Sequence, residues 1–327
     1  GRVVSDLARR RWAMEPSVHP SEGSLAHVVS GPDPAIDGLE YELYVSDLTG
    51  ETLSLGRGAR SPRWSPDGSR VAYAKRVDDG WVPGCHDLAL GEVDWPAPPG
   101  ELLHLSWAPD GTRLLAITSV AESDDSENLP YRVESSSDWN PAHRTCAWVI
   151  EQGADPARLG ADLGDIIAAD FAPDGQRVAL VTKQGVDQDT SIAAGLWLVT
   201  LDDPEPQCLV PPEVPIHAAV WSPDGVSIAF LASRRDNSNS ALIDLWVIGV
   251  EDLSRRHLGP ELDRSVGKAV RGDDERAVGP PILAWSPDSD SVLAIYADGG
   301  LSRLARFDLL PFVNQNLRDP RRASGRH

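Results

Sequence analysis

A short pattern of apolar and polar positions returns along this chain. Each copy has a few apolar residues that end in an aromatic side chain, then a proline and an acidic residue, and then glycine or serine. Five copies are clear, at 62–68, 105–111, 169–175, 219–225 and 283–289, and a weaker first copy lies at 16–23. A unit of this kind cannot bury its apolar face alone, so the pattern predicts an array of packed repeats.

The centre of each copy predicts a hairpin turn. In the second copy it reads Pro66-Asp67-Gly68. Proline presets φ for the first corner, aspartate accepts bonds from nearby backbone, and glycine adopts the left-handed conformation that other residues resist. The apolar runs that follow the turns predict buried strands at 70–74, 113–117, 177–181, 227–231 and 291–295.

Further strands complete each unit. Third strands are expected at 43–47, 147–151, 196–200, 245–249 and 304–308, and fourth strands at 53–55 and 207–210. The turn positions are 43 to 64 residues apart, and the shorter intervals match one four-stranded propeller blade with the longer ones carrying loop insertions. The sequence therefore predicts an all-β fold, a β-propeller of four-stranded antiparallel blades. Six copies predict six blades, with seven as the alternative.

The recurring aromatic residues have a structural interpretation. They stand two residues before the turn proline and are expected to fill the wedge between adjacent blades. A role in stacking on a ligand is disfavoured because they recur at one repeat position: Trp64, Trp107, Phe171, Trp221 and Trp285.

The repeats define the expected domains. Residues 1–15 are a lead segment, 16–310 the propeller and 311–327 a tail. A ring of blades usually closes with strands from both ends, since an open seam exposes unpaired edges. The segment before Pro16 and residues 301–313 are the candidates for that closure, and deleting either is expected to lower the melting temperature sharply.

Composition narrows the function classes. The chain has 327 residues, 41% of them hydrophobic, and a formal net charge of −20, which disfavours nucleic acid and anionic membranes as partners. We find no apolar run near 18 residues and no signal peptide. Three cysteines without zinc spacing favour a reducing compartment, here the cytoplasm. No cofactor motif is present, so no cofactor or metal is expected.

The repeat is similar to the TolB-like, or WD40-like, propeller repeat. From about residue 5 to residue 310, the order of segments resembles the front half of prolyl oligopeptidase family serine peptidases of the acylaminoacyl-peptidase type. The segments that carry this resemblance are Ser5-Asp6-Leu7-Ala8, Pro16 to Pro20, Leu25 to Ser30, Tyr41 to Gly50, Ser61 to Ala74, Leu129 to Arg132 and Cys146 to Val149.

The resemblance implies a role without chemistry in this chain. In that family an α/β-hydrolase domain carries the serine, aspartate and histidine, while the propeller covers the active site and admits short peptides. The sequence has no Gly-x-Ser-x-Gly nucleophile elbow, and Ser227 belongs to a repeat turn and strand. The residues after Leu310 are too few for a hydrolase. The partners expected are therefore a hydrolase domain, or another protein, and peptide substrates, and enzymatic activity depends on that domain.

Two polar clusters remain as candidate sites. Arg132, Asp138 and His143 lie in the longest insertion and are the possible peptide or ligand contacts, with His143 as a general base; a polar loop before a strand is the competing interpretation. Cys85-His86 suggests a thiol nucleophile, but adjacency supplies neither an activating base nor an oxyanion site.

Three functions stay open. The chain is the propeller of a serine peptidase, or a stand-alone propeller that binds a protein or small ligand, or a propeller whose channel residues are themselves catalytic. An open reading frame that continues past His327 into a Gly-x-Ser-x-Gly segment distinguishes the first from the second.

Overall fold

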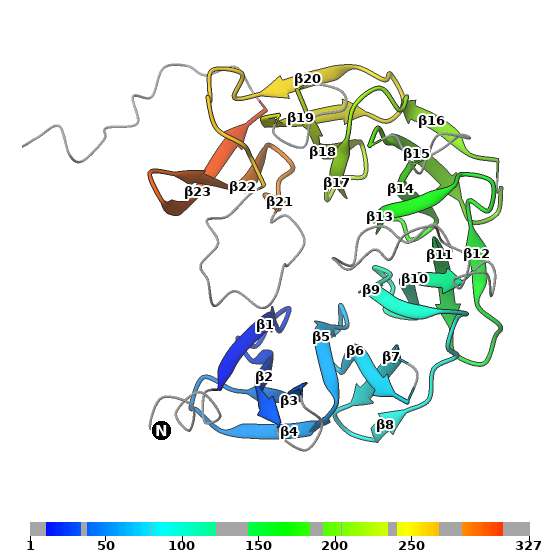
Figure 1. Ribbon diagram of the computed structural model, residues 1–327, viewed down its shortest axis with the longest axis vertical. Helices are drawn as coiled ribbons and strands as arrows, with labels where there is room; N and C mark the ends of the chain where they lie inside the picture. Colours follow the sequence, from blue (N-terminus) through cyan, green and yellow to red (C-terminus); the bar gives the residue numbers. More distant parts are fainter. Residues whose placement is uncertain are drawn as a thin grey trace, which may run out of the picture.

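The chain forms a ring of six antiparallel sheets, each one blade of a β-propeller, in a computed structural model (Figure 1). The structure describes residues 11–33, 38–78, 80–121, 143–183, 192–203, 205–234, 241–267 and 283–309. Five sheets have four strands, and the sixth has three among these residues. The predicted all-β propeller of six blades is confirmed.

The blades follow one another along the chain. Blade 1 holds β1 (Trp12–Val18), β2 (Leu25–Asp33), β3 (Gly38–Ser46) and β4 (Thr52–Arg57). Blade 2 holds β5 (Ala59–Trp64), β6 (Arg70–Val77), β7 (Gly80–Asp87) and β8 (Gly91–Val93). Blade 3 holds β9 (Glu101–Trp107), β10 (Arg113–Ala121), β11 (His143–Glu151) and β12 (Ala157–Leu159). β1 thus begins four residues before the propeller start expected at residue 16.

The second half of the ring repeats this order. Blade 4 holds β13 (Asp165–Phe171), β14 (Arg177–Lys183), β15 (Gly195–Thr200) and β16 (Gln207–Val210). Blade 5 holds β17 (Ile216–Trp221), β18 (Ser227–Ser233), β19 (Ile243–Gly249) and β20 (Arg255–Leu258). Blade 6 holds β21 (Leu283–Trp285), β22 (Ser291–Asp298) and β23 (Leu301–Asp308). The first strand of each blade lies nearest the centre of the ring (Figure 1).

The repeated motif forms the turn between the first and second strands, as predicted. In blade 2 the Gly68 amide donates to the Ser65 carbonyl at 2.9 Å, and Gly68 has φ of 74°. Asp67 accepts hydrogen bonds from the Ser65 hydroxyl and the Ser69 amide. These bonds, led by that from Ser65, lower the pKa of Asp67 to about 2. The carboxylate therefore holds the turn closed.

An arginine ladder, made of Arg70, Arg113 and Arg177, ties blades 2 to 5 together. Each arginine begins the second strand of its blade, and its Nη2 donates to the turn glycine carbonyl of the next blade, at 2.7 to 3.2 Å. Each guanidinium also lies over the next motif aromatic, with ring centroids 4.9 to 5.9 Å away. Each arginine thus joins its blade to the next through both a charge-assisted hydrogen bond and a cation–π contact.

The two end junctions replace this arginine. Between blades 1 and 2, His19 Nε2 lies 3.1 Å from the Gly68 carbonyl, while its Nδ1 accepts two backbone amides. Between blades 5 and 6, Ser227 stands where the ladder has arginine, and the turn residue is Ser289, with φ of 60°. Ser289 Oγ accepts a hydrogen bond from the Asp224 amide at 3.1 Å.

Five hydrophobic clusters fill the five junctions between consecutive blades. Trp64, Phe171 and Trp221 are buried in them, so the predicted wedge role is confirmed. The indole N–H groups of Trp64, Trp107 and Trp285 each donate to a carbonyl of the preceding blade's first strand, at 2.9 to 3.1 Å.

The described parts of the two predicted closing segments do not pair with each other. Among the described residues each blade is built from one contiguous segment, and no sheet mixes strands from the two ends. No cluster of buried described residues joins blade 6 to blade 1 either. Closure by strands otherwise stays a prediction, because residues 1–10 and 310–313 are not described.

The two faces of the ring differ. Because the strands of a blade run antiparallel in consecutive order, the connections from first to second strand and from third to fourth strand lie on one face. The connections from second to third strand, and from one blade to the next, lie on the opposite face. Short motif turns occupy the first face. On the second face, here the variable face, second strands end and third strands begin, as at Ala121 and His143 in blade 3.

Candidate functional site

The residues predicted as ligand contacts lie largely outside the described structure. Arg132 and Asp138 fall within residues 122–142, which are not described. His143 begins β11, where its backbone pairs with Ala121, but its side chain is not described. The role of these three residues as contacts therefore stays a prediction.

Cys85 and His86 lie in the third strand of blade 2. Cys85 is fully buried in the junction with blade 3, and burial raises the pKa of its thiol to about 11. A thiol that ionises so late is a poor nucleophile at neutral pH. The structure therefore favours the structural interpretation of this pair.

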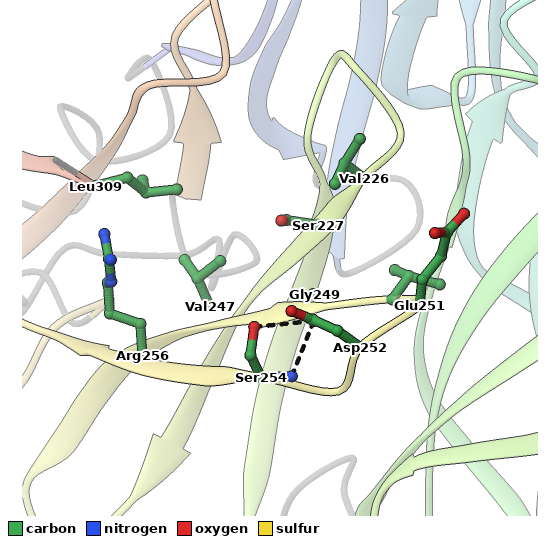
Figure 2. A pocket seen from close by; sticks show the side chains of 10 residues that line it. Val226, Ser227, Val247, Gly249, Glu251, Asp252, Ser254, Arg256 and Leu309 are labelled. Carbon is green, nitrogen blue, oxygen red and sulfur yellow. Dashed lines mark hydrogen bonds between the residues drawn. The ribbon is translucent and has the colours of Figure 1, made fainter.

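A cavity of about 420 Å³ lies at the rim between blades 5 and 6 (Figure 2). Its polar groups include Glu251, Arg256 and a loop in which Ser254 donates to Asp252 from both its amide and its hydroxyl. Leu309, from blade 6, forms the opposite wall.

A second cavity, of about 250 Å³, occupies the same repeat position between blades 3 and 4. Leu201 lines it as Leu309 lines the first, and each donates its amide to the residue just before a second strand. Arg113 fills part of the second cavity where the first has Ser227. Both cavities are therefore furrows of the repeat, and the shorter side chain leaves the larger space.

The innermost strands carry a more specific feature. Each of the first five departs from regular pairing near its middle, through a β-bulge or irregularity. In blades 1 and 2 the irregular positions include Glu15 and Ser61, with φ of 52° and 55°. The Ser61 amide donates to the Glu15 carboxylate at 2.6 Å. Two left-handed non-glycine residues in contact are strained, and such strain gathers at functional sites.

A polar row continues around the ring from this pair. Counted back from the motif aromatic, the first and third positions share one side of the strand, because strand side chains alternate. Those positions are polar in blades 1 to 3, and aspartate takes the first in blade 4: Glu15, Ser17, Ser61, Arg63, His104, Ser106 and Asp170. We call these seven residues the inner polar row. In blade 5 the same positions hold Ala218 and Val220.

Within this row the side chains of one blade reach the next. Ser17 Oγ accepts the Trp64 amide at 3.3 Å, and Asp170 Oδ2 accepts the Trp221 amide at 2.9 Å. Burial nevertheless raises the pKa of Asp170 to about 7, against these backbone hydrogen bonds. Asp170 therefore titrates near neutral pH.

Arg63 and His104 are the basic side chains of the row. Burial lowers the pKa of Arg63, and the charge of Glu15 opposes that effect. Burial also lowers the pKa of His104 to about 4, with a further contribution from the Arg63 charge. The imidazole is therefore neutral at pH 7, beside a guanidinium that stays charged. Such a pair can donate hydrogen bonds to an anion.

Sequence reasoning missed this row. Its signal was present, because the polar residues stand at fixed offsets before the motif aromatic. What the sequence lacked was evidence that these offsets face the next blade at the centre of a ring.

The described residues were searched for metal-ligand groups and for membrane-spanning helices. Among them, no group of three or more histidine, cysteine, aspartate or glutamate side chains is placed to hold a metal ion. None of their secondary structure is a helix long and apolar enough to cross a bilayer.

No protein-family model matches the chain, and no curated protein matches it by sequence. Solved structures do match. Acylaminoacyl peptidase from Pyrococcus horikoshii has a TM-score of 0.65 and 16% identity, over 92% of this chain and 45% of that one. The β-propeller domain of the Trilobed protease from Pyrococcus furiosus, described as having an open velcro topology, has a TM-score of 0.63 and 15% identity, over 92% and 83%.

A third solved structure also matches. Hydrazine synthase from Kuenenia stuttgartiensis has a TM-score of 0.53 and 15% identity, over 85% of this chain and 72% of that one. The chain spans about half the length of the acylaminoacyl peptidase it matches. At these identities the likeness establishes the fold, and the expected resemblance to the propeller of acylaminoacyl peptidases is confirmed at that level.

Proposed function

We propose that this chain is the propeller part of a prolyl oligopeptidase-like serine peptidase, which covers the active site of an α/β-hydrolase domain and restricts access to short peptides. The observation that carries the proposal is the match over 92% of this chain to just under half of an acylaminoacyl peptidase. On this view the nucleophile, acid and base belong to the hydrolase domain, and the propeller contributes walls and an entrance.

The innermost strands support this role, because their polar positions change from blade to blade around the centre of the ring. A reducing compartment, such as the cytoplasm, belongs to the same proposal, since Cys85, Cys146 and Cys208 lie in three different blades and form no disulfide among the described residues.

A fluorophosphonate probe tests the proposal. The protein is purified from its native source, labelled, and analysed by intact mass, with a sample blocked by phenylmethylsulfonyl fluoride as the control. We expect label on a longer parent chain or on a tightly bound partner, lost in the blocked sample. An unlabelled protein of 35.3 kDa without a labelled partner would contradict it and favour the stand-alone binding propeller.

A further inference from the structure

The junction between blades 5 and 6 lacks the arginine that the junctions of the ladder use. Arg70, Arg113 and Arg177 each donate to the turn carbonyl of the next blade and lie over its motif aromatic. Ser227 takes the same repeat position in blade 5. Its side chain is too short to cross to blade 6, so the groups that would receive a guanidinium there get none from this position.

Two of these receiving groups lie in blade 6. Trp285 is its motif aromatic, and no cation of the described structure lies over the ring. Trp285 is also partly exposed, whereas Phe171 and Trp221, which lie under arginines, are each 6% exposed. The Ser289 carbonyl corresponds to the glycine carbonyls that the ladder bonds, and no donor among the described residues reaches it. Blade 6 thus presents the ladder's acceptor and its ring without the ladder's cation.

A third receiving group belongs to blade 5 itself. In blades 3 and 4 the ladder arginine also pairs with the aspartate of its own turn, Arg113 with Asp110 at 2.7 Å and Arg177 with Asp174 at 2.6 Å. Asp224 is the corresponding residue of blade 5. Its Oδ1 accepts two hydrogen bonds from its own turn, and with the described residues the carboxylate forms no ion pair. A carboxylate, a carbonyl and an indole face therefore remain at one junction, each of a kind that binds guanidinium elsewhere in this ring.

Space for the missing group is present at this junction. Ser227 and Leu309 line its cavity of about 420 Å³ (Figure 2). At the equivalent place between blades 3 and 4, Arg113 and Leu201 line a cavity of about 250 Å³. Arg113 both lines that cavity and donates to the Gly175 carbonyl at 2.8 Å. A guanidinium beside Ser227 can therefore reach the turn carbonyl of blade 6 along the path that Arg113 takes in blade 3.

The charged groups of the cavity also suit a cation. Glu251 and Asp252 line it together with Arg256, so its carboxylates outnumber its guanidinium. Arg256 lies on the outermost strand β20 and makes no side-chain hydrogen bond or ion pair with the described residues. It therefore does not take the place of the ladder arginine.

We propose that this junction binds the arginine side chain of a polypeptide partner in the space that Ser227 leaves. The guanidinium bonds to the Asp224 carboxylate and the Ser289 carbonyl and lies over the Trp285 ring. Guanidinium suits these groups together, because its planar fork donates to two acceptors while its face stacks on an indole. The site needs only this chain, so it stands or falls separately from the hydrolase proposal.

NMR titration of the full chain tests the site. The probes are N-acetylarginine amide, N-acetylcitrulline amide as its uncharged isostere, and N-acetyllysine amide as a cation without the planar fork. We expect the arginine probe to bind about tenfold more tightly than the citrulline probe, since hydrogen bonds to charged groups are the stronger ones. It should also shift the Trp285 indole N–H resonance, which Trp285→Phe assigns. A lysine probe that binds as tightly as the arginine probe would overturn the choice of guanidinium.

Variants test whether the space left by Ser227 is the site. Ser227→Arg restores the ladder, so it should abolish binding and raise the melting temperature. Gln176→Arg, which adds the same charge at an exposed turn residue of blade 4, should do neither.

A second variant covers the case of a misfolded Ser227→Arg. Arg177→Ser opens the same space between blades 4 and 5, and should add a second site that also prefers arginine to citrulline. Equal or undetectable binding of the arginine and citrulline probes to wild type would overturn the proposal. Unchanged binding in a folded Ser227→Arg would overturn it as well.

Discussion

The turn edge of the propeller is uniform, whereas its innermost strands diverge. At the turn edge, Arg70, Arg113 and Arg177 make the same two contacts with the next blade. At the innermost strands, the same repeat positions hold Glu15, arginine, histidine, aspartate or alanine. A contact repeated at each junction stabilises the ring, so function is better sought where the repeat departs from itself.

The innermost strands of the first four blades also differ together from that of the fifth. Blades 1 to 4 carry the inner polar row, whereas blade 5 has Ala218 and Val220 at the same two positions. Polar groups held at the centre of a ring cost desolvation energy that an aliphatic residue avoids. The innermost strands of the first four blades therefore keep polar groups that the fifth blade replaces with aliphatic side chains.

The largest expected effect on stability comes from replacing a motif aromatic, which belongs to the uniform repeat. Trp64→Ala should lower the free energy of unfolding by about 4 kcal/mol, because it empties a buried wedge and removes the indole bond to the Ser17 carbonyl. Trp64→Phe should cost less, about 2 kcal/mol, since it loses the hydrogen bond and only part of the buried ring. Urea denaturation measures both. Equal losses would show that packing does not dominate this junction.

Asp170 makes the divergent part sensitive to pH. Its pKa is raised to about 7 in the folded state, so the folded state binds the proton more tightly than the unfolded chain. Stability is therefore lost as pH rises from about 4 to 7. Asp170→Asn keeps an acceptor for the Trp221 amide without this penalty. We expect it to gain about 1–2 kcal/mol over wild type at pH 8, discounted for partial exposure.

Urea curves at pH 5 and pH 8 check that result. The gain of Asp170→Asn should be smaller at pH 5, because wild type is then largely protonated in the folded state. A gain that is equal at both pH values would show that the carboxyl group is ionised throughout this range.

Replacing one arginine of the ladder should lower the stability in proportion to the contacts that this arginine makes. Arg177→Gln removes the bond to the Gly225 carbonyl and the cation over Trp221, with an expected loss of about 1–2 kcal/mol. Arg256→Gln, on the exposed outer strand β20, is the charge-matched comparison and should lose less. Thermal denaturation of both variants measures the difference. Similar losses would mean that the ladder contributes charge alone.

The smallest expected effect on stability comes from relieving the backbone strain at Ser61. Ser61→Gly accepts φ of 55° without penalty and should raise the free energy of unfolding by about 0.5 kcal/mol, whereas Ser61→Ala should not. Urea denaturation of both variants measures this difference, and an unchanged free energy of unfolding in Ser61→Gly would show that the backbone at Ser61 is not strained.

The repeat made much of the fold predictable. Pro66, Asp67 and Gly68 predicted a turn between strands, and their spacing predicted six blades of the observed kind. Closure by strands from both ends stays a prediction, because its candidate segments lie partly outside the described residues and a linear pattern does not reveal which edges meet across the ring. The candidate contacts Arg132, Asp138 and His143 were chosen as a polar cluster in sequence, and the described structure leaves them untested.

The sequence by itself determined the blade and its number, because turn chemistry and strand alternation are local properties. Only the tertiary structure decided that Arg70 reaches Gly111 and that the Trp107 indole donates to the Arg63 carbonyl. Those pairs are about 40 residues apart in sequence, and their contact depends on how one blade rotates onto the next. Side chains that face a neighbouring blade are thus identified by packing, whereas the strands that carry them are identified by pattern.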